Sequence, residues 1–129
     1  MSTYSSLAVY KASYDFLIRL IVLTKNFDRE YKFTLGESIK KEAMEMMKNI
    51  YRANSSNNKQ QLIQAARENI EMIRLDFRIL QDLKQLNLKR FVFLNEKVEG
   101  ISKQLIAWQK FFKQGGPELS SAMAKTSEL

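Results

Sequence analysis

Pairs of glutamates three residues apart are the arrangement in this sequence best suited to acid–base or metal chemistry. They are Glu42 with Glu45, Glu68 with Glu71, and Glu96 with Glu99. On a helix each pair shares one face and could approach a metal ion or act as acid and base. A di-iron bundle also needs Glu-x-x-His on two helices, and the sequence has no histidine. Because lysine and arginine lie at helical spacing beside each pair, we interpret them as solvated ion pairs.

Cysteine is absent as well as histidine. Disulfide scaffolds, Cys/His zinc sites, haem bound through histidine, thiol nucleophiles and imidazole-based triads are therefore excluded. Neither Leu35-Gly36-Glu37 nor Gly115-Gly116 resembles a phosphate-binding loop or a dinucleotide fingerprint. We therefore expect a protein that is not an enzyme and that uses no metal and no cofactor.

The elements that must position any site are predicted to be helices. Only four glycines and one proline interrupt 129 residues of which 45% are hydrophobic. Helical periodicity places four segments at about 6–25, 35–53, 59–86 and 88–114. Thr34 with Glu37 predicts a capping box for the second helix, and Asn87 predicts an N-cap for the fourth. The polar residues 54–58 form the clearest loop.

Each predicted helix carries an apolar stripe that we assign to the core. The first has Leu7, Tyr10, Tyr14, Leu17 and Ile21; the second has Leu35, Ile39, Ala43, Met46 and Ile50; the third has Leu62, Ala66, Ile70, Ile73, Phe77 and Leu80; the fourth has the heptad seam Phe91, Leu94, Val98, Ile101, Leu105, Trp108 and Phe112. This pattern predicts an all-α, up-down-up-down antiparallel four-helix bundle over residues 1–114. Residues 115–129 are expected to form a flexible tail. Gly100 beside the seam predicts close approach of a neighbouring helix.

The first and third predicted helices carry a second apolar face roughly opposite the first. These interface candidates are Val9, Phe16, Leu20 and Leu23 on the first helix and Met72, Leu75, Ile79, Leu83 and Leu86 on the third. One bundle cannot bury both apolar faces of a helix. The first and third helices are diagonal neighbours, so their second apolar faces point to different sides of the protomer. When contacts between unlike faces repeat from subunit to subunit and return to the first one, they make a ring. We therefore expect a ring-shaped homo-oligomer. The alternatives are isolated surface leucines or a less regular core.

The net charge of +7 predicts an acidic partner, most commonly nucleic acid, with an anionic membrane surface or an acidic protein as alternatives. The fourth helix alone contributes +4. The candidates for phosphate contact are Arg67, Arg74, Arg78, Lys89, Lys103 and Lys110. The alternative is a solvated face that keeps the protein soluble. No signal peptide or membrane-spanning run is visible, so we expect a cytoplasmic protein.

The stretch from Phe27 to Gly36 resembles a known signature. The usual pattern is Phe-Pro-(Lys/Arg), two variable positions, a basic residue, Phe, one variable position and then Leu-Gly. The matches here are Phe27, Arg29, Lys32, Phe33, Leu35 and Gly36. It is similar to the loop-and-helix motif of the small four-helix-bundle family that includes ribosomal-RNA intervening-sequence proteins and the accessory variability determinant, Avd, of diversity-generating retroelements. Asp28 replaces the proline, which we expect to alter how the loop enters the second helix. The absence of Pro-x-Asn-Ile-Ala-Glu-Gly after that helix favours the Avd branch.

This resemblance covers roughly residues 10–112 and implies a function. It implies a basic, non-enzymatic homopentamer that binds RNA or DNA and associates with a reverse transcriptase to support mutagenic retrohoming. The five-fold number rests on the resemblance alone. The alternative is a structural or adaptor bundle of the ribosomal-RNA intervening-sequence type with no nucleic-acid role.

Overall fold

The computed structural model describes residues 4–113, with side chains over residues 7–112, and these residues form a bundle of four long helices and one short one. In chain order they are α1 (Tyr4–Thr24), α2 (Arg29–Lys32), α3 (Leu35–Ala53), α4 (Lys59–Asp82) and α5 (Leu88–Lys113). The described residues contain no strand. None of the described helices is apolar over a sufficient length to cross a membrane. The predicted tail, residues 115–129, lies outside the described residues.

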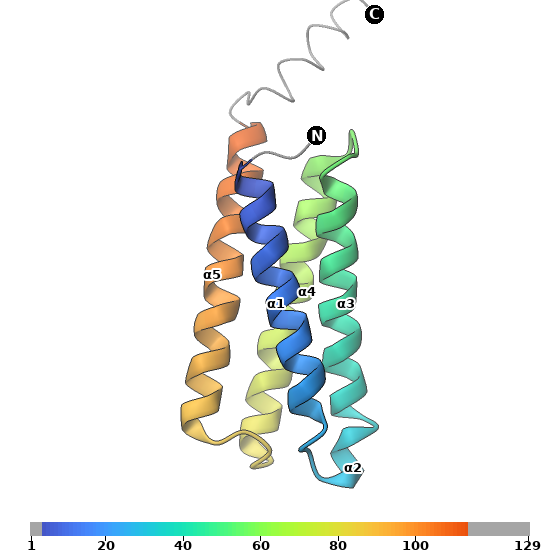
Figure 1. The fold of residues 1–129 in the computed structure, drawn as a ribbon, viewed down its shortest axis with the longest axis vertical. Helices are drawn as coiled ribbons and strands as arrows, with labels where there is room; N and C mark the ends of the chain where they lie inside the picture. The colour runs from blue at the N-terminus through green and yellow to red at the C-terminus, as the bar shows by residue number, and fades with distance from the viewer. Residues whose placement is uncertain (1–3, 114–129) are drawn as a thin grey trace, which may run out of the picture.

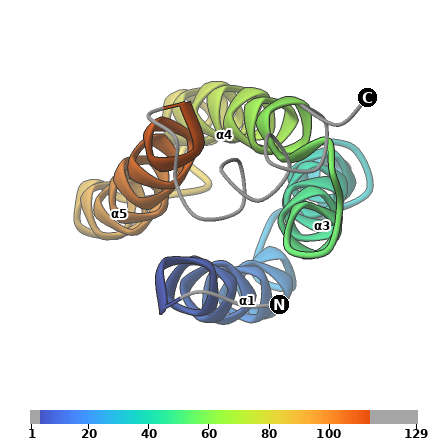
Figure 2. The same ribbon diagram turned by 90° about the horizontal axis from the view of Figure 1, so that it is seen from above.

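The long helices run up and down in turn, with the short α2 at the end where α1 leads into α3 (Figure 1). α1 contacts α3 and α5, and α4 contacts the same two helices, so α1 and α4 are diagonal. Figure 2 shows this square arrangement from above. The predicted four-helix bundle is therefore confirmed, and the outer faces of α1 and α4 point to opposite sides of the protomer.

The helix ends follow local hydrogen bonding: α3 begins at Leu35 as predicted but without the expected capping box, and α4 ends before the predicted residue 86. Thr34 precedes α3, but its hydroxyl donates to the carbonyl of Glu30 at 3.0 Å and does not cap the helix, so the predicted capping box is not formed. α4 ends at Asp82 because Lys84 adopts φ 61° and the Gln85 amide donates to the Leu80 carbonyl at 2.8 Å. This is a Schellman ending without the glycine that normally reveals it. The Asn87 cap is confirmed: its Oδ1 accepts the Arg90 amide at 2.8 Å.

The core of the bundle is lined by the predicted stripes of α3, α4 and α5. Ile39, Ile73 and Leu105 have no exposed surface, and Trp108 is 1% exposed. Of the predicted stripe positions on these three helices, only Leu35, Leu62 and Phe91 are half-buried. The polar run at residues 54–58 joins α3 to α4, as predicted.

The face of α1 that enters the core is largely the opposite of the predicted one; of the predicted stripe on this helix, Leu17 is buried at 7% exposure, as expected. Val9 and Leu20 are fully buried, and the Phe16 ring packs edge-on against Phe77 with 6.1 Å between ring centroids. In contrast, Leu7 is 55% and Tyr14 48% exposed. Both faces are apolar, so hydrophobicity alone could not choose between them. The physical difference is that the outward face carries tyrosines, whose hydroxyls need partners when they are buried.

No neighbouring helix packs closely against Gly100. An added Cβ there would meet nothing within 4 Å, so the expected close approach is wrong for this protomer. Because Gly100 lies inside α5, we expect Gly100→Ala to raise the free energy of unfolding by about 0.5–1 kcal/mol through the lower backbone entropy of the unfolded chain. Urea unfolding measures this difference. A loss of stability would show that something outside the protomer occupies the space beside Gly100.

Candidate nucleic-acid and subunit interfaces

The lysines predicted to contact phosphates lie exposed on α5, on the side away from the core. Lys89, Lys103 and Lys110 are separated by 14 and 7 residues, whole numbers of heptads, so they follow one stripe on the helix. Over residues 7–112 none of the three has an acidic partner within ion-pair distance. Seven residues rise about 10 Å along a helix, so the ammonium groups of Lys103 and Lys110 can reach separate phosphates.

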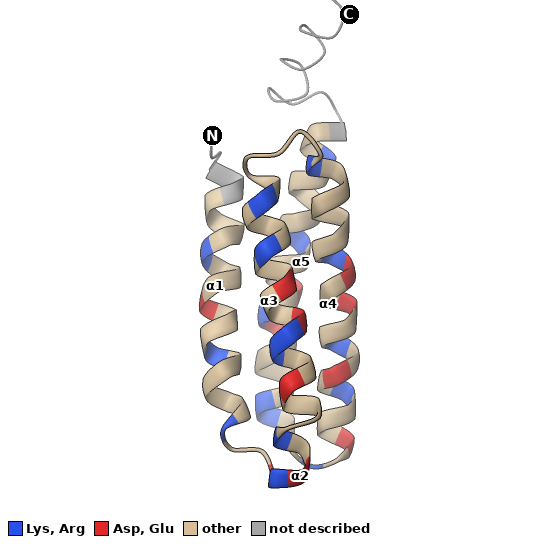
Figure 3. Ribbon diagram, turned by 90° about the vertical axis from the view of Figure 1, so that its right-hand side faces the viewer, with Lys and Arg blue, Asp and Glu red and all other residues tan. Residues whose placement is uncertain are grey.

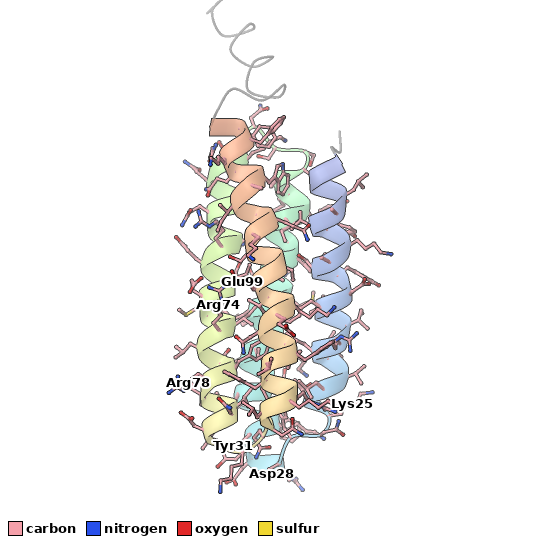
Figure 4. All side chains as sticks on the ribbon, turned by 90° about the vertical axis from the view of Figure 1, so that its left-hand side faces the viewer. Lys25, Asp28, Tyr31, Arg74, Arg78 and Glu99 are labelled. Atoms are coloured by element: carbon pink, nitrogen blue, oxygen red, sulfur yellow. The ribbon has the colours of Figure 1, made fainter. Side chains whose placement is uncertain are left out.

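The arginines predicted on α4 are mostly held within the protomer. Arg67 Nη1 donates to Gln109 Oε1 of α5 at 2.6 Å. Arg74 bridges Glu71 at 2.9 Å and Glu99 at 2.7 Å, and Figure 4 shows Arg74 and Glu99 meeting between α4 and α5. Arg78 is exposed, with its Nε 3.6 Å from Asp82. Arg67 and Arg74 therefore join α4 to α5, and only Arg78 of these three presents a largely solvated cation.

Three of the six paired glutamates, Glu45, Glu71 and Glu99, form ion pairs, whereas Glu68 and Glu96 are exposed and have no ion pair over residues 7–112. Glu71 and Glu99 bind Arg74, and Glu45 lies 3.6 Å from Lys48. Glu42 differs, because it accepts a hydrogen bond from Asn69 at 3.0 Å between α3 and α4. Among the residues that the structure describes, no three acidic side chains converge on a point that could hold a metal ion.

Asp76 on α4 is a buried carboxyl that the sequence pattern did not reveal. It is 8% exposed, and Ser38 of α3 donates a hydrogen bond to its Oδ2 at 3.3 Å. Burial raises the pKa of the Asp76 carboxyl above its ordinary value of 3.8, the Ser38 hydrogen bond opposes this rise, and repulsion by Glu42 adds to it. The charged form of Asp76 is therefore unfavourable in the folded protein.

This raised pKa gives the bundle a pH-dependent stability. A raised pKa means that the folded state holds the proton more tightly than the unfolded state, so stability is lost as the pH rises from 3.8 through the folded pKa. We expect Asp76→Asn, which keeps a hydrogen-bond acceptor for Ser38, to increase the free energy of unfolding at pH 7 by on the order of 1 kcal/mol. Urea unfolding across this range should show the gain shrinking towards acid pH. A variant less stable at pH 7 would mean that the carboxylate contributes favourable contacts.

A large groove opens between α1 and α5 towards the end of the bundle that carries α2. It has a volume of about 1750 Å³, and its apolar lining is Tyr14, Ile18, Val22, Leu23, Leu88, Val92, Phe93 and Leu94. Arg19, Lys89 and Arg90 lie along it, with Asp15 and Glu96 as the acidic members. Figure 1 shows α1 and α5 diverging towards this end. Small-molecule pockets measure about 300–1,000 Å³, so the groove is too large for a single small ligand and has the dimensions for a helix.

The structure divides the predicted subunit contacts into two groups. Val9, Phe16, Leu20, Leu23 and Leu86 are at most 6% exposed, so their assignment to an outer face is wrong. They line the protomer's own core because α1 turns its other face outward, and Leu86 folds inward after α4 has ended. Met72, Leu75 and Leu83 are exposed by 46%, 52% and 37%, and Ile79 is half-buried, so the outer position of the α4 set is confirmed.

Comparison with known proteins identifies the family. The bAvd-like family model matches residues 7–112, which include nearly all of the described bundle. The chain belongs to the bAvd-like family. A solved structure from Bacteroides thetaiotaomicron, described as a protein with unknown function from the S23 ribosomal protein family, is similar to it with a TM-score of 0.76. The two share 19% sequence identity over 82% of this chain and 98% of the other, a likeness that shows the fold alone. No curated protein matches the chain.

In this bAvd-like protein the residues of the loop signature have structural roles. Phe27 is 5% exposed, and its ring lies 3.5 Å from where a Cβ on Gly36 would stand, so the loop packs closely over the start of α3. Asp28 has φ −56°, a value that proline also adopts, so the backbone keeps a proline-compatible shape and the expected altered entry is not seen. Unlike proline, Asp28 donates its amide to Gln85 Oε1 at 2.7 Å and accepts from Gln85 Nε2 at 2.9 Å.

Proposed function

We propose that this bAvd-like chain is a non-enzymatic, cytoplasmic accessory protein of a diversity-generating retroelement. It binds RNA or DNA through α5 and associates with the element's reverse transcriptase to support mutagenic retrohoming. Family membership supports the link to the retroelement. The observation that carries the nucleic-acid part is the stripe of Lys89, Lys103 and Lys110, exposed on α5 without acidic partners among residues 7–112.

Charge reversal on α5 tests this surface. We expect Lys103→Glu with Lys110→Glu to weaken binding to a fluorescent duplex on the order of 100-fold at moderate salt, because each subunit loses two phosphate contacts and gains two repulsive charges. Lys25→Glu with Arg29→Glu is the matched control: the change in charge is the same, but both residues are exposed at the opposite end of the bundle. An equal loss of duplex affinity in both double variants would show a nonspecific charge effect and would contradict a nucleic-acid-binding surface on α5.

We also propose that the chain assembles into a ring, with the outer face of α4 in one copy seated in the α1–α5 groove of the next. The α4 face (Met72, Leu75, Ile79 and Leu83) spans about three helical turns, a length comparable to the groove. Exposed Glu68, Arg78 and Asp82 lie beside the α4 face, and Asp15, Arg19, Arg90 and Glu96 lie along the groove, so each surface offers charges of both signs around an apolar centre. The family resemblance suggests five copies.

A mixing experiment distinguishes unlike faces from a symmetric contact. Met72→Asp with Leu83→Asp disables the α4 face, and Ile18→Asp with Val92→Asp disables the groove. Each double variant should be monomeric by sedimentation equilibrium, whereas an equimolar mixture should form a dimer, since one intact groove then meets one intact α4 face. Absence of that dimer would contradict this pairing.

Association with the reverse transcriptase is tested by co-purification with a tagged reverse transcriptase of a diversity-generating retroelement. Retention of the tagged polymerase by the wild-type chain is the expected result. The adaptor alternative predicts a stable oligomer that binds neither nucleic acid nor polymerase. Those two outcomes are mutually exclusive.

A further inference from the structure

Three exposed tyrosines cluster where α1 meets α3. The Tyr10 ring is 6.4 Å from the Tyr14 ring with an interplanar angle of 20°, and 6.4 Å from the Tyr51 ring on α3. The three residues are 38%, 48% and 67% exposed. We call these three residues the tyrosine cluster. The sequence pattern predicts Tyr10 and Tyr14 in the core, whereas α1 turns both tyrosines outward and so creates this aromatic surface.

Basic residues flank the tyrosine cluster on both helices, with Asp15 next to Tyr14 as an acidic neighbour. Lys11 is three residues before Tyr14, and Lys48 is three residues before Tyr51, a spacing that makes each lysine a neighbour of the tyrosine on the helix surface. Arg52 is one turn beyond Lys48. Over residues 7–112 Lys11 and Arg52 have no acidic partner, and Lys48 has only Glu45 at 3.6 Å. Figure 3 shows basic residues on the upper parts of both α1 and α3 on this face.

We propose that the tyrosine cluster is a stacking surface for unpaired bases, so that the protein binds single-stranded nucleic acid here, in addition to phosphate contacts on α5. This inference rests on the proposed nucleic-acid function and names the substrate class. Exposed aromatic rings beside cations are the general means of holding single strands, because every base has a face that can stack while the cations contact the backbone. In a duplex the bases are already stacked inside, so the cluster adds nothing to duplex binding.

A second copy of the chain is the competing occupant of this surface. The charges around the tyrosine cluster disfavour a second copy as its occupant. The apolar outer face of α4 is the predicted partner of the α1–α5 groove, whereas the basic residues around Tyr10 and Tyr51 are suited to binding a polyanion. Tyr14 also lines the groove, so the experiment changes Tyr10 and Tyr51 and leaves Tyr14 intact.

The test compares the affinities for a single-stranded oligonucleotide and for its duplex by fluorescence anisotropy. Tyr10→Leu with Tyr51→Leu removes the stacking rings but keeps apolar bulk, and we expect it to weaken single-strand binding about 10-fold or more while leaving duplex affinity unchanged. Tyr10→Phe with Tyr51→Phe keeps the rings and should retain wild-type single-strand affinity. Circular dichroism verifies that both double variants stay folded.

The other outcomes separate this inference from the proposed function. If the leucine variant binds single strands as the wild type does, while charge reversal on α5 still abolishes duplex binding, the stacking inference fails and the proposed function stands. If the leucine variant has a lower molar mass than the wild type, the tyrosine cluster is a subunit contact and the inference is overturned. If the wild type binds neither oligonucleotide, both fail.

Discussion

Leu20→Ala is expected to lower the free energy of unfolding by about 3–5 kcal/mol, whereas Leu7→Ala on the same helix should change it by less than about 1 kcal/mol. Both substitutions remove the same atoms from a leucine of α1. Leu20 has no exposed surface, so its truncation leaves a cavity in the core; Leu7 is 55% exposed and leaves none. The contrast measures directly which face of α1 enters the bundle.

Urea unfolding at one fixed protein concentration provides the comparison, because assembly would otherwise shift the apparent stability. Phe16 is 3% exposed, so we expect Phe16→Ala to lower the free energy of unfolding about as strongly as Leu20→Ala does. Larger destabilisation by Leu7→Ala than by Leu20→Ala would restore the face predicted from periodicity and contradict the fold described above.

Lys59→Met is expected to destabilise the bundle by about 3 kcal/mol or more, a large effect for a lysine. The Lys59 ammonium, on a side chain 7% exposed, donates to the carbonyls of Ala53 at 2.8 Å, Asn54 at 3.3 Å and Ser56 at 2.9 Å. These bonds satisfy acceptors at the end of α3, where a positive charge is also favoured by the helix dipole. Hydrogen bonds to a charged group each contribute about 1.5–3 kcal/mol, and methionine keeps the stem but supplies no donor.

The matched control for Lys59→Met is Lys41→Met. Lys41 is exposed on α3 and has no ion pair or hydrogen bond among residues 7–112, so its loss should be nearly neutral. Hydrogen exchange of the amides at the start of α4 should accelerate in Lys59→Met alone. Equal stabilities of the two variants would show that the ammonium does not hold the α3–α4 connection.

The number, order and approximate ends of the long helices could be predicted from sequence because their apolar spacing and polar loops are clear. The inward face of α1 could not, since both faces of this helix carry large hydrophobic side chains, such as Leu7 on one side and Val9 and Phe16 on the other. Packing against α3, α4 and α5 makes that choice. The end of α4 was equally hidden, because a lysine with positive φ occupies a position where glycine would be recognisable.

The candidate sites were only partly visible in the sequence for a similar reason. Counting charges indicated the lysines of α5, but it could not show that Arg67 and Arg74 are held by residues of α5, since those partners are 42 and 25 residues away in the chain. The tyrosine cluster forms because α1 turns its tyrosines outward, so it could not be predicted from the sequence either. No sequence pattern marks Asp76 and Lys59 as buried, because their burial depends on α3 and α4 lying side by side.

Salt dependence of the affinity of the wild-type protein for a nucleic acid is the measurement that tests the central claim most directly. If the basic surface neutralises phosphates, the logarithm of the association constant should fall linearly with the logarithm of the salt concentration, with a slope of about −0.9 per duplex phosphate contact. The double variant Lys103→Glu with Lys110→Glu should show a shallower slope. An affinity that stays flat between about 50 and 200 mM salt would contradict phosphate binding by this protein.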